Sequence, residues 1–291
     1  MAKILVTGIG GPAGKSVTTL LLEAKHQVIG TDSRVIYWDG ITFYQVPEAN
    51  HSNFCNYLYQ IAQTEKVDLI ISTVSEELPI LASPRLASHR AYFAKYPVVI
   101  ASPTTVFIAN DKYFTFKHLS KRGIATPRSL LTSQAVSPDE IGFKIGWPCL
   151  SKPRISRGGR KVKIYCESKW PEVKSLDEQY LLQEFIPGIE YCPNLYRAQN
   201  GETTVVVLEK TALKEVVIGN ALKVKRVQAP DVANLAVAAA KALDLTGPAD
   251  IDIRRRSDGT PAILEINARF GAHIMEAPEV FSSLLGDFQL K

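Results

Sequence analysis

The spacing of apolar and polar positions divides the chain into two regions. Over the first hundred residues, short apolar runs typical of buried strands alternate with stretches of helical spacing. We expect strands at 3–7, 27–31, 67–73 and 96–101, and a helix at 13–25. Strands that are separated by helical patterns predict a parallel sheet with crossover helices, which is an α/β fold.

The pattern changes near residue 110. Residues 110–122 predict a helix that is closed by Gly123, and residues 231–243 predict an Ala-rich amphipathic helix. Between and after these helices, we expect strands at 147–152, 161–165 and 181–186, an antiparallel pair at 202–210 and 215–227, and a hairpin at 250–267. Because strands no longer alternate strictly with helices, we place a boundary near Asn110 and expect an α+β region after it.

Composition narrows the class of protein. The length of 291 residues suggests about two domains, or three small ones. Apolar residues make up 46% and charged residues 22%, which is ordinary for a globular chain and excludes disorder as an overall description. The net charge of +5 is mild, so the composition gives little support to nucleic-acid binding.

Targeting segments and the spacing of the cysteines indicate the cellular compartment of the protein. No apolar stretch approaches the ~18 residues of a membrane span, and the start of the chain does not resemble a signal peptide. The four cysteines include no CxxC pair. We therefore expect a cytoplasmic protein with reduced cysteines and with neither a nucleic-acid nor a membrane partner.

A glycine-rich turn, Gly8-Ile9-Gly10-Gly11-Pro12-Ala13-Gly14-Lys15-Ser16, follows the first strand. Its spacing does not fit a P-loop, because position 9 is Ile. A dinucleotide-binding fingerprint is nearly met, and Asp32 ends the second strand where a ribose-binding acid would lie. The alternative is that the glycines only permit a tight turn and close helix packing. We favour the alternative, which leaves an NAD(P)-binding oxidoreductase as the weaker functional hypothesis.

The segment 248–271 predicts a hairpin with polar and apolar faces. Asp258-Gly259 is a signal for a two-residue loop. With that loop, Asp252 lies opposite Glu265 and Asp250 opposite Asn267, and Arg254 shares their face. The other face is expected to enter the core, and it comprises Ile251, Ile253, Leu264 and Ile266.

Opposed carboxylates need a counter-charge. Asp252 and Glu265 would repel each other unless one has a raised pKa or a divalent cation lies between them. Oxygen ligands from Asp, Glu and an Asn amide suit Mg²⁺ or Mn²⁺, and the segment has no His/Cys set for zinc. Because Mg²⁺ usually needs substrate phosphates to complete its shell, the hairpin predicts a polyphosphate nearby.

Residues 148–160 supply a candidate phosphate site. Lys152 ends a predicted strand, and the loop after it contains three arginines, a serine, Gly158 and Gly159. Such a loop can direct N–H groups and side-chain cations at phosphate oxygens, or it can be only a basic, solvated hairpin tip. The carboxylate hairpin favours the phosphate interpretation.

Four stretches, taken in order, resemble the ATP-grasp superfamily, and most of all its carbamoyl-phosphate-synthase-like and D-alanine-ligase-like carboxylate–amine ligases. They are Asp111-Lys112, the Lys152-Pro153 strand with its glycine loop, the QEFIPGIEY segment at 183–191, and the hairpin through the EINAR segment at 265–269. The resemblance covers essentially the whole chain. It implies a Rossmann-like preATP-grasp domain at 1–109, a small ATP-grasp subdomain with a phosphate lid at 110–180, and a large subdomain with the metal and nucleotide site at 181–291.

The resemblance also implies roles for particular residues. Phosphate contacts would come from Lys112 and Lys152, under a lid that contains Gly158 and Gly159. The nucleotide site would comprise Gln183, Glu184, Phe185 and Ile186, with Glu184 and the backbone of the last two at the adenine edge, and Glu190 at the ribose. One or two Mg²⁺ ions would be bound by Asp252, Glu265 and Asn267. Arg269 and Arg254 would stabilise the charge that develops during phosphoryl transfer.

The activity that the resemblance implies is ATP-dependent ligation of a small-molecule carboxylate and an amine. The acceptor site is expected near Ser75, Glu76 and Glu77 and in the region 269–276. Only 22 residues follow Arg269, which leaves room for a homodimer or a partner subunit. A non-catalytic ATP-binding subunit of a split carbamoyl-phosphate-synthase-like complex is therefore the alternative function.

Overall fold

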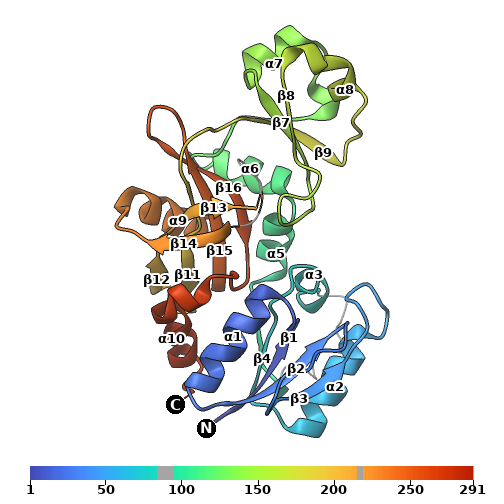
Figure 1. Cartoon of the computed structure of the whole chain (residues 1–291), viewed down its shortest axis with the longest axis vertical. Coiled ribbons are helices and arrows are strands. Elements are labelled where there is room, and N and C mark those ends of the chain that lie inside the picture. The colour runs from blue at the N-terminus through green and yellow to red at the C-terminus, as the bar shows by residue number, and fades with distance from the viewer. Residues whose placement is uncertain (84–94, 215–218, 220, 291) are drawn as a thin grey trace.

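Three sheets, stacked along the long axis of the molecule, organise the residues that the computed structural model describes, which are 1–83, 95–214, 219 and 221–290 (Figure 1). The N-terminal sheet lies at one end, a small four-stranded sheet at the other, and the large sheet between them. Within those residues, no helix is both long and apolar enough to cross a membrane.

The N-terminal sheet confirms the predicted parallel α/β arrangement. Its strand order is β3-β2-β1-β4-β5, with all neighbours parallel. The strands are β1 (Lys3–Thr7), β2 (Gln27–Asp32), β3 (Thr42–Gln45), β4 (Leu69–Ile71) and β5 (Val98–Val99), and the helices are α1 (Pro12–Glu23), α2 (Phe54–Glu65) and the short α3 (Leu78–Leu81). The edge strand β3 was not predicted, because its half-buried residues give no continuous apolar run.

The end of the described chain packs onto the N-terminal sheet. The 3₁₀ turn Ile274–Glu276 and helix α10 (Pro278–Asp287) share one apolar cluster with β1 and α1, in which Phe270 and Phe281 contact residues such as Ile4 and Leu21. Ser16 Oγ also donates to the carbonyl of Ala272 at 2.7 Å. The first and last elements of the chain therefore fix each other, and both termini lie at the same end of the molecule (Figure 1).

The glycine turn is filled by the protein's own side chains. Gly8 has a left-handed φ of +64°, and a Cβ there would lie 2.3 Å from Val74 Cγ2. A Cβ on Gly10 would lie 2.5 Å from Ile36 Cδ1. Asp32 accepts hydrogen bonds from the backbone N–H groups of Gly10 and Arg34, each at 3.0 Å. This packing supports the structural interpretation of the glycines and argues against a dinucleotide site.

Glu77 is a buried carboxyl group at the carboxyl ends of β1 and β4. It accepts hydrogen bonds from the hydroxyls of Thr7 and Ser72. Burial raises the pKa of Glu77 to about 7, although these two hydrogen bonds oppose the rise. The residue therefore binds its proton more tightly in the folded protein than in the unfolded chain, where the ordinary value is 4.5.

We expect Glu77→Gln to stabilise the protein relative to wild type more at pH 8 than at pH 5. In wild type, protonated Glu77 makes its full contribution to the stability of the folded state below pH 4.5. This contribution is lost as the pH rises to about 7, because the folded state then releases a proton that it binds more tightly than the unfolded chain does. Gln does not titrate. Thermal unfolding from pH 5 to 8 measures the difference, and the exposed Glu202→Gln is the control. A pH-independent difference would contradict the prediction.

The small sheet has the order β6-β9-β7-β8 and is antiparallel. It comprises β6 (Ser129–Leu131), β7 (Cys149–Pro153), β8 (Lys163–Tyr165) and β9 (Tyr180–Glu184). One face packs on α7 (Pro138–Lys144) and α8 (Trp170–Lys174) through a compact apolar cluster. Strand β9 spans the expected division at residue 180 and belongs entirely to this sheet.

The large sheet, of order β12-β11-β15-β10-β13-β14 with β16 beside β15, has an apolar face and a charged face. Its strands are β10 (Glu190–Tyr191), β11 (Asn194–Arg197), β12 (Thr203–Val206), β13 (Leu208–Leu213), β14 (Ala221–Arg226), β15 (Gly247–Arg255) and β16 (Pro261–Asn267). Helices α5 (Pro103–Asn110), α6 (Lys112–Ser120) and α9 (Pro230–Ala242) pack on the apolar face.

The predicted strand at 202–210 is interrupted at Val207. Its first half, β12, pairs with β11, while its second half, β13, pairs with β10 and β14. The predicted antiparallel pairing with 215–227 is therefore confirmed only for β13 and β14. Residues 215–218 and 220 of that prediction lie outside the described residues.

The β15–β16 hairpin has the predicted pairing at the acidic residues but a different turn. Asp252 pairs with Glu265 and Asp250 with Asn267, as expected. The predicted two-residue loop is wrong, because Arg256 N–H donates to the carbonyl of Thr260 at 2.9 Å and residues 257–259 form the loop. A bulge at Leu264 then restores the predicted register, so Ile263 pairs with Ile253 and occupies the core position expected for Leu264.

Candidate active site

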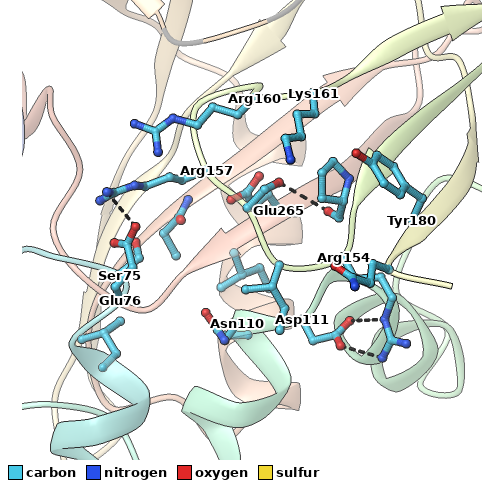
Figure 2. A pocket seen from close by; sticks show the side chains of 18 of the residues that line it. Ser75, Glu76, Asn110, Asp111, Arg154, Arg157, Arg160, Lys161, Tyr180 and Glu265 are labelled. Atoms are coloured by element: carbon cyan, nitrogen blue, oxygen red, sulfur yellow. Dashed lines mark hydrogen bonds and ion pairs between the residues drawn. The ribbon is translucent and has the colours of Figure 1, made fainter. Parts of the chain in front are cut away.

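A cavity of about 990 Å³ lies where the three sheets approach one another (Figure 2). Glu265 and Asn267 of β16 form one wall, and the loop 153–161 that follows β7 forms another. The loop after β4 contributes Ser75 and Glu76 from the N-terminal domain. The cavity is therefore lined by two of the three predicted metal ligands, by the predicted phosphate loop and by part of the expected acceptor region, whereas Asp252, Lys112 and Lys152 are not among its lining residues.

The charged face of the large sheet gathers four carboxylates from three strands. Strand pairing places Glu190 beside Arg254, Asp252 beside Glu265, and Asp250 beside Asn267. The fourth acid, Asp250, is partly buried, with 17% of its side chain exposed. Burial, together with the charge of Asp252, raises the pKa of its carboxyl group above the ordinary value. This face therefore concentrates negative charge, and side-chain cations of the protein contact each of the four acids.

Lys210 of β13 was not predicted to be part of the site. Its Nζ lies 2.5 Å from Glu190 Oε1 and 2.7 Å from Asp252 Oδ1. Burial alone would lower the pKa of Lys210, but Asp252 and Glu190 raise it above its ordinary value. The sequence contained one signal for this residue. Lys210 follows the apolar Leu208 by two positions, so in a strand the two side chains lie on the same, inward-facing side.

Lys112 and Lys152 meet above the hairpin, as predicted. Lys112 Nζ lies 3.6 Å from Glu265 Oε2 and donates to the carbonyl of Ser156 at 2.6 Å. Lys152 Nζ donates at 3.0 Å to the carbonyl of Leu264, the bulged residue. Burial and the neighbouring charge of Lys112 lower the pKa of Lys152 to about 7. Two buried ammonium groups side by side favour an anion that would relieve their repulsion.

The three arginines of the basic loop have different partners. Arg154 forms a bidentate pair with Asp111, at 2.7 and 3.3 Å, and its guanidinium lies over the rings of Tyr113 and Phe114. Arg157 Nη2 lies 2.6 Å from Glu76 Oε1. Arg160 lines the cavity without a hydrogen bond or ion pair of its side chain among the described residues (Figure 2).

The segment after β9 connects the small and large sheets. Gln183 shares a sheet face with Lys152, because it pairs with Leu150 while Lys152 pairs with Leu181. Glu184 lies on the opposite face, where its carboxylate contacts Arg128 Nε at 3.4 Å and Arg256 Nε at 3.3 Å. The structure therefore does not bring Glu184 together with the other predicted nucleotide residues.

The other predicted residues of this connection differ in accessibility. Phe185 is half-buried and Ile186 is buried, and the carbonyl of Ile186 accepts a hydrogen bond from Arg254 Nη1 at 3.2 Å. Glu190 is contacted by both Lys210 and Arg254. Arg254 is buried in these contacts, so it orients Glu190 and the connection instead of facing the cavity.

Arg269 faces the N-terminal domain. Its Nε donates to Ser75 Oγ at 3.1 Å, and its Nη1 lies 3.5 Å from Asp250 Oδ2. The two arginines that were predicted to stabilise the same charge are therefore separated: Arg254 lies at the connection between the sheets, and Arg269 lies at the interface with the N-terminal domain.

The residues present fit a magnesium ion. Among the described residues, no cluster of three or more His, Cys, Asp or Glu side chains forms an all-protein metal cage. The hairpin offers two carboxylates and an amide on adjacent positions of one face. Mg²⁺ is typically bound by one or two carboxylates together with substrate phosphates, so this donor set matches that mode of binding.

Comparison with known proteins agrees with the fold. A family model described as an ATP-grasp domain matches residues 109–273, which is more than half of the chain. The α-aminoadipate–LysW ligase LysX of Sulfolobus acidocaldarius is 29% identical over 99 residues, covering 34% of this chain and 32% of that protein. A D-alanine–D-alanine ligase of Azobacteroides pseudotrichonymphae genomovar. CFP2 is 30% identical over 110 residues, covering 35% of this chain and 34% of that protein. The chain thus matches about a third of the length of these relatives.

Solved structures share the architecture. L-amino acid ligase from Bacillus licheniformis superposes with a TM-score of 0.72 and 17% identity, covering 96% of this chain and 70% of that one. D-alanine–D-alanine ligase from Bacillus anthracis superposes with a TM-score of 0.63 and 16% identity, covering 100% of this chain and 94% of that one. At these identities, the likeness establishes the fold.

Proposed function

Because the chain belongs to the ATP-grasp family, we propose that it is an ATP- and Mg²⁺-dependent, ADP-forming ligase that joins a carboxylate to an amine. The observation that best supports this function is the pairing of Asp252 with Glu265 directly beneath Lys112, Lys152 and the basic loop. Carboxylates that would bind a cation thus lie close to basic residues that would bind phosphates, and Glu265, Asn267 and the basic loop line the same cavity.

We assign the nucleotide to the space between the small and large sheets. Lys112 and Lys152 would contact its phosphates, with Gly158 and Gly159 in the loop above them. Gln183 and the backbone of Phe185 and Ile186 would contact the base. Glu190 would contact the ribose while Lys210 and Arg254 hold its carboxylate in place.

The metal would be held by Asp252, Glu265 and Asn267. When bound there, Mg²⁺ (or Mn²⁺) would neutralise charge on the phosphate oxygens. The residues around it would position the reactants: Lys112 and Lys152 would orient the phosphates, and Arg269, which donates to the cavity-lining Ser75, would contact the carboxylate.

The reaction is proposed as two displacements. A carboxylate oxygen attacks the γ-phosphorus, the bond from that phosphorus to the bridging oxygen of ADP breaks, and an acyl phosphate forms. The amine nitrogen then attacks the acyl carbon, the C–N bond forms, inorganic phosphate leaves and the nitrogen loses a proton. Phosphoryl transfer depends on positioning and charge neutralisation, so it needs no nucleophilic side chain. Cys149 lies in the apolar cluster of the small sheet, where burial raises the pKa of its thiol to about 12, so it is no candidate nucleophile.

The experiment that tests this function is an ADP-release screen with ATP, Mg²⁺ and paired libraries of carboxylates and amines. Amino acids enter the library first, because the similar proteins named above are ligases of amino acids and of aminoadipate. We expect ADP release that depends on a carboxylate and an amide product that depends on both substrates. ATP binding without ADP release from any pair would instead support the non-catalytic subunit.

A further inference from the structure

Residues 154–161 form the basic loop, and contacts from two different elements hold its tip in place. From α6, Lys112 Nζ donates to the carbonyl of Ser156 at 2.6 Å. From the N-terminal domain, Glu76 Oε1 pairs with Arg157 Nη2 at 2.6 Å, across the cavity that both residues line (Figure 2). The loop is thus connected to an element that lies outside both ATP-grasp sheets.

The base and the tip of the loop differ in how firmly they are attached. At the base, the bidentate Arg154–Asp111 pair is reinforced by the rings of Tyr113 and Phe114. At the tip, the side chains of Arg157 and Glu76 are 42% and 48% exposed. An ion pair so exposed contributes little to stability and opens readily. Gly158 and Gly159, both with left-handed φ, follow Arg157 and let the chain turn there.

The N-terminal partner is also connected to the ligase core. Glu76 directly follows Ser75, whose Oγ accepts a hydrogen bond from Arg269 Nε at 3.1 Å. Two consecutive residues of the loop after β4 therefore contact the basic loop and Arg269. Closure of the basic loop and the position of Arg269 are in this way tied to one short segment.

We propose that Glu76 is a positioning residue that latches residues 154–161 over the cavity by binding Arg157, and that this latch keeps water from the acyl phosphate until the amine attacks. The second half of the proposal rests on the proposed ligase function, while the latch itself does not. An acyl phosphate that meets water first gives the free carboxylate and inorganic phosphate, and ATP is then consumed without amide formation.

The latch is tested first by amide hydrogen exchange, which needs no activity. Glu76→Gln keeps the side-chain size and removes the charge. We expect exchange in residues 154–161 to become about 1.5- to 5-fold faster, with little change elsewhere. Glu279→Gln is the matched control, because it breaks an Arg–Glu pair of 2.7 Å and similar exposure far from the cavity. Arg157→Gln should reproduce the effect of Glu76→Gln.

The protection of the intermediate is tested with the substrate pair found in the screen. Wild type should form close to one amide per ADP. Glu76→Gln should lower this ratio at limiting amine, and the reversed pair Glu76→Arg with Arg157→Glu should restore it, which a role in folding alone would not predict. Exchange and product ratio that both match wild type would overturn the proposal. Faster exchange in a protein that releases no ADP would support the latch and would count against the ligase function.

Discussion

Glu265→Gln is expected to lower Mg²⁺-dependent ADP formation by roughly a hundredfold or more while leaving the fold intact. The substitution removes one of the two opposed carboxylates of the hairpin, and with it the charge that would balance the metal and the nearby lysines. The fold should survive, because Gln has nearly the same shape and Lys112 keeps its hydrogen bond to the Ser156 carbonyl. Steady-state ADP release and circular dichroism measure the two effects.

Glu209→Gln is the control for that experiment. Glu209 is also a strand residue of the large sheet, its side chain is also 20% exposed, and it pairs with Lys225 at 3.0 Å on the side away from Lys210. Its removal should leave ADP release unchanged. If Glu265→Gln released ADP as fast as Glu209→Gln, the metal assignment would be wrong.

Lys152→Ala is expected to weaken nucleotide binding by roughly 1.5–3 kcal/mol, or about 10- to 150-fold, because a charged hydrogen bond to phosphate is lost. Lys152→Met is the companion variant: it removes the charge that lies 5.0 Å from the centroid of the Phe116 ring, but its long side chain avoids a cavity. Calorimetric titration with a nonhydrolysable ATP analogue and Mg²⁺ measures both variants. Unchanged affinity in Lys152→Met would remove Lys152 from the nucleotide site.

The lowered pKa of Lys152 gives the same experiment a pH dependence. With a pKa of about 7 in the free protein, Lys152 is largely neutral at pH 8 and largely charged at pH 6. Phosphate oxygens beside it favour the charged form, so binding at pH 8 should take up protons and affinity should fall as the pH rises from 6 to 8. Calorimetry in buffers of different ionisation enthalpy measures this uptake. In Lys152→Met, the proton uptake that comes from Lys152 should be absent.

The hairpin illustrates why local prediction succeeded at the most informative place. The apolar alternation of β15 and β16 required one face to enter the core, which placed Asp252 and Glu265 together on the other. The loop prediction was wrong by one residue, and the bulge at Leu264 compensated for it. The alternation of apolar and polar residues does not show this bulge, nor that its Leu264 carbonyl accepts a hydrogen bond from Lys152, which is more than a hundred residues earlier.

The contacts that prediction missed share one property, which is that the two partners are distant in sequence. Lys210 enters the site only because β13 pairs with β10, and Glu184 is turned from it because Arg128 and Arg256 bind its carboxylate. The segment Ser75-Glu76 was expected near an acceptor site, but nothing in its sequence indicated Arg157 or Arg269 as partners. Such contacts depend on how the three sheets are placed, which short-range patterns do not encode.

By itself, the amino-acid order determined the parallel N-terminal sheet, the acidic face of the hairpin and the basic loop, because each depends on alternation, turn residues and charge within a few dozen positions. The tertiary structure alone decided which charges meet. It paired Arg254 with Glu190, placed Lys210 between two carboxylates, and joined Glu76 to Arg157 across the cavity. The physical reason is that a charge in a folded protein pairs with whichever opposite charge the packing of remote segments brings within a few ångströms, and apolar packing, not the charges, sets that placement.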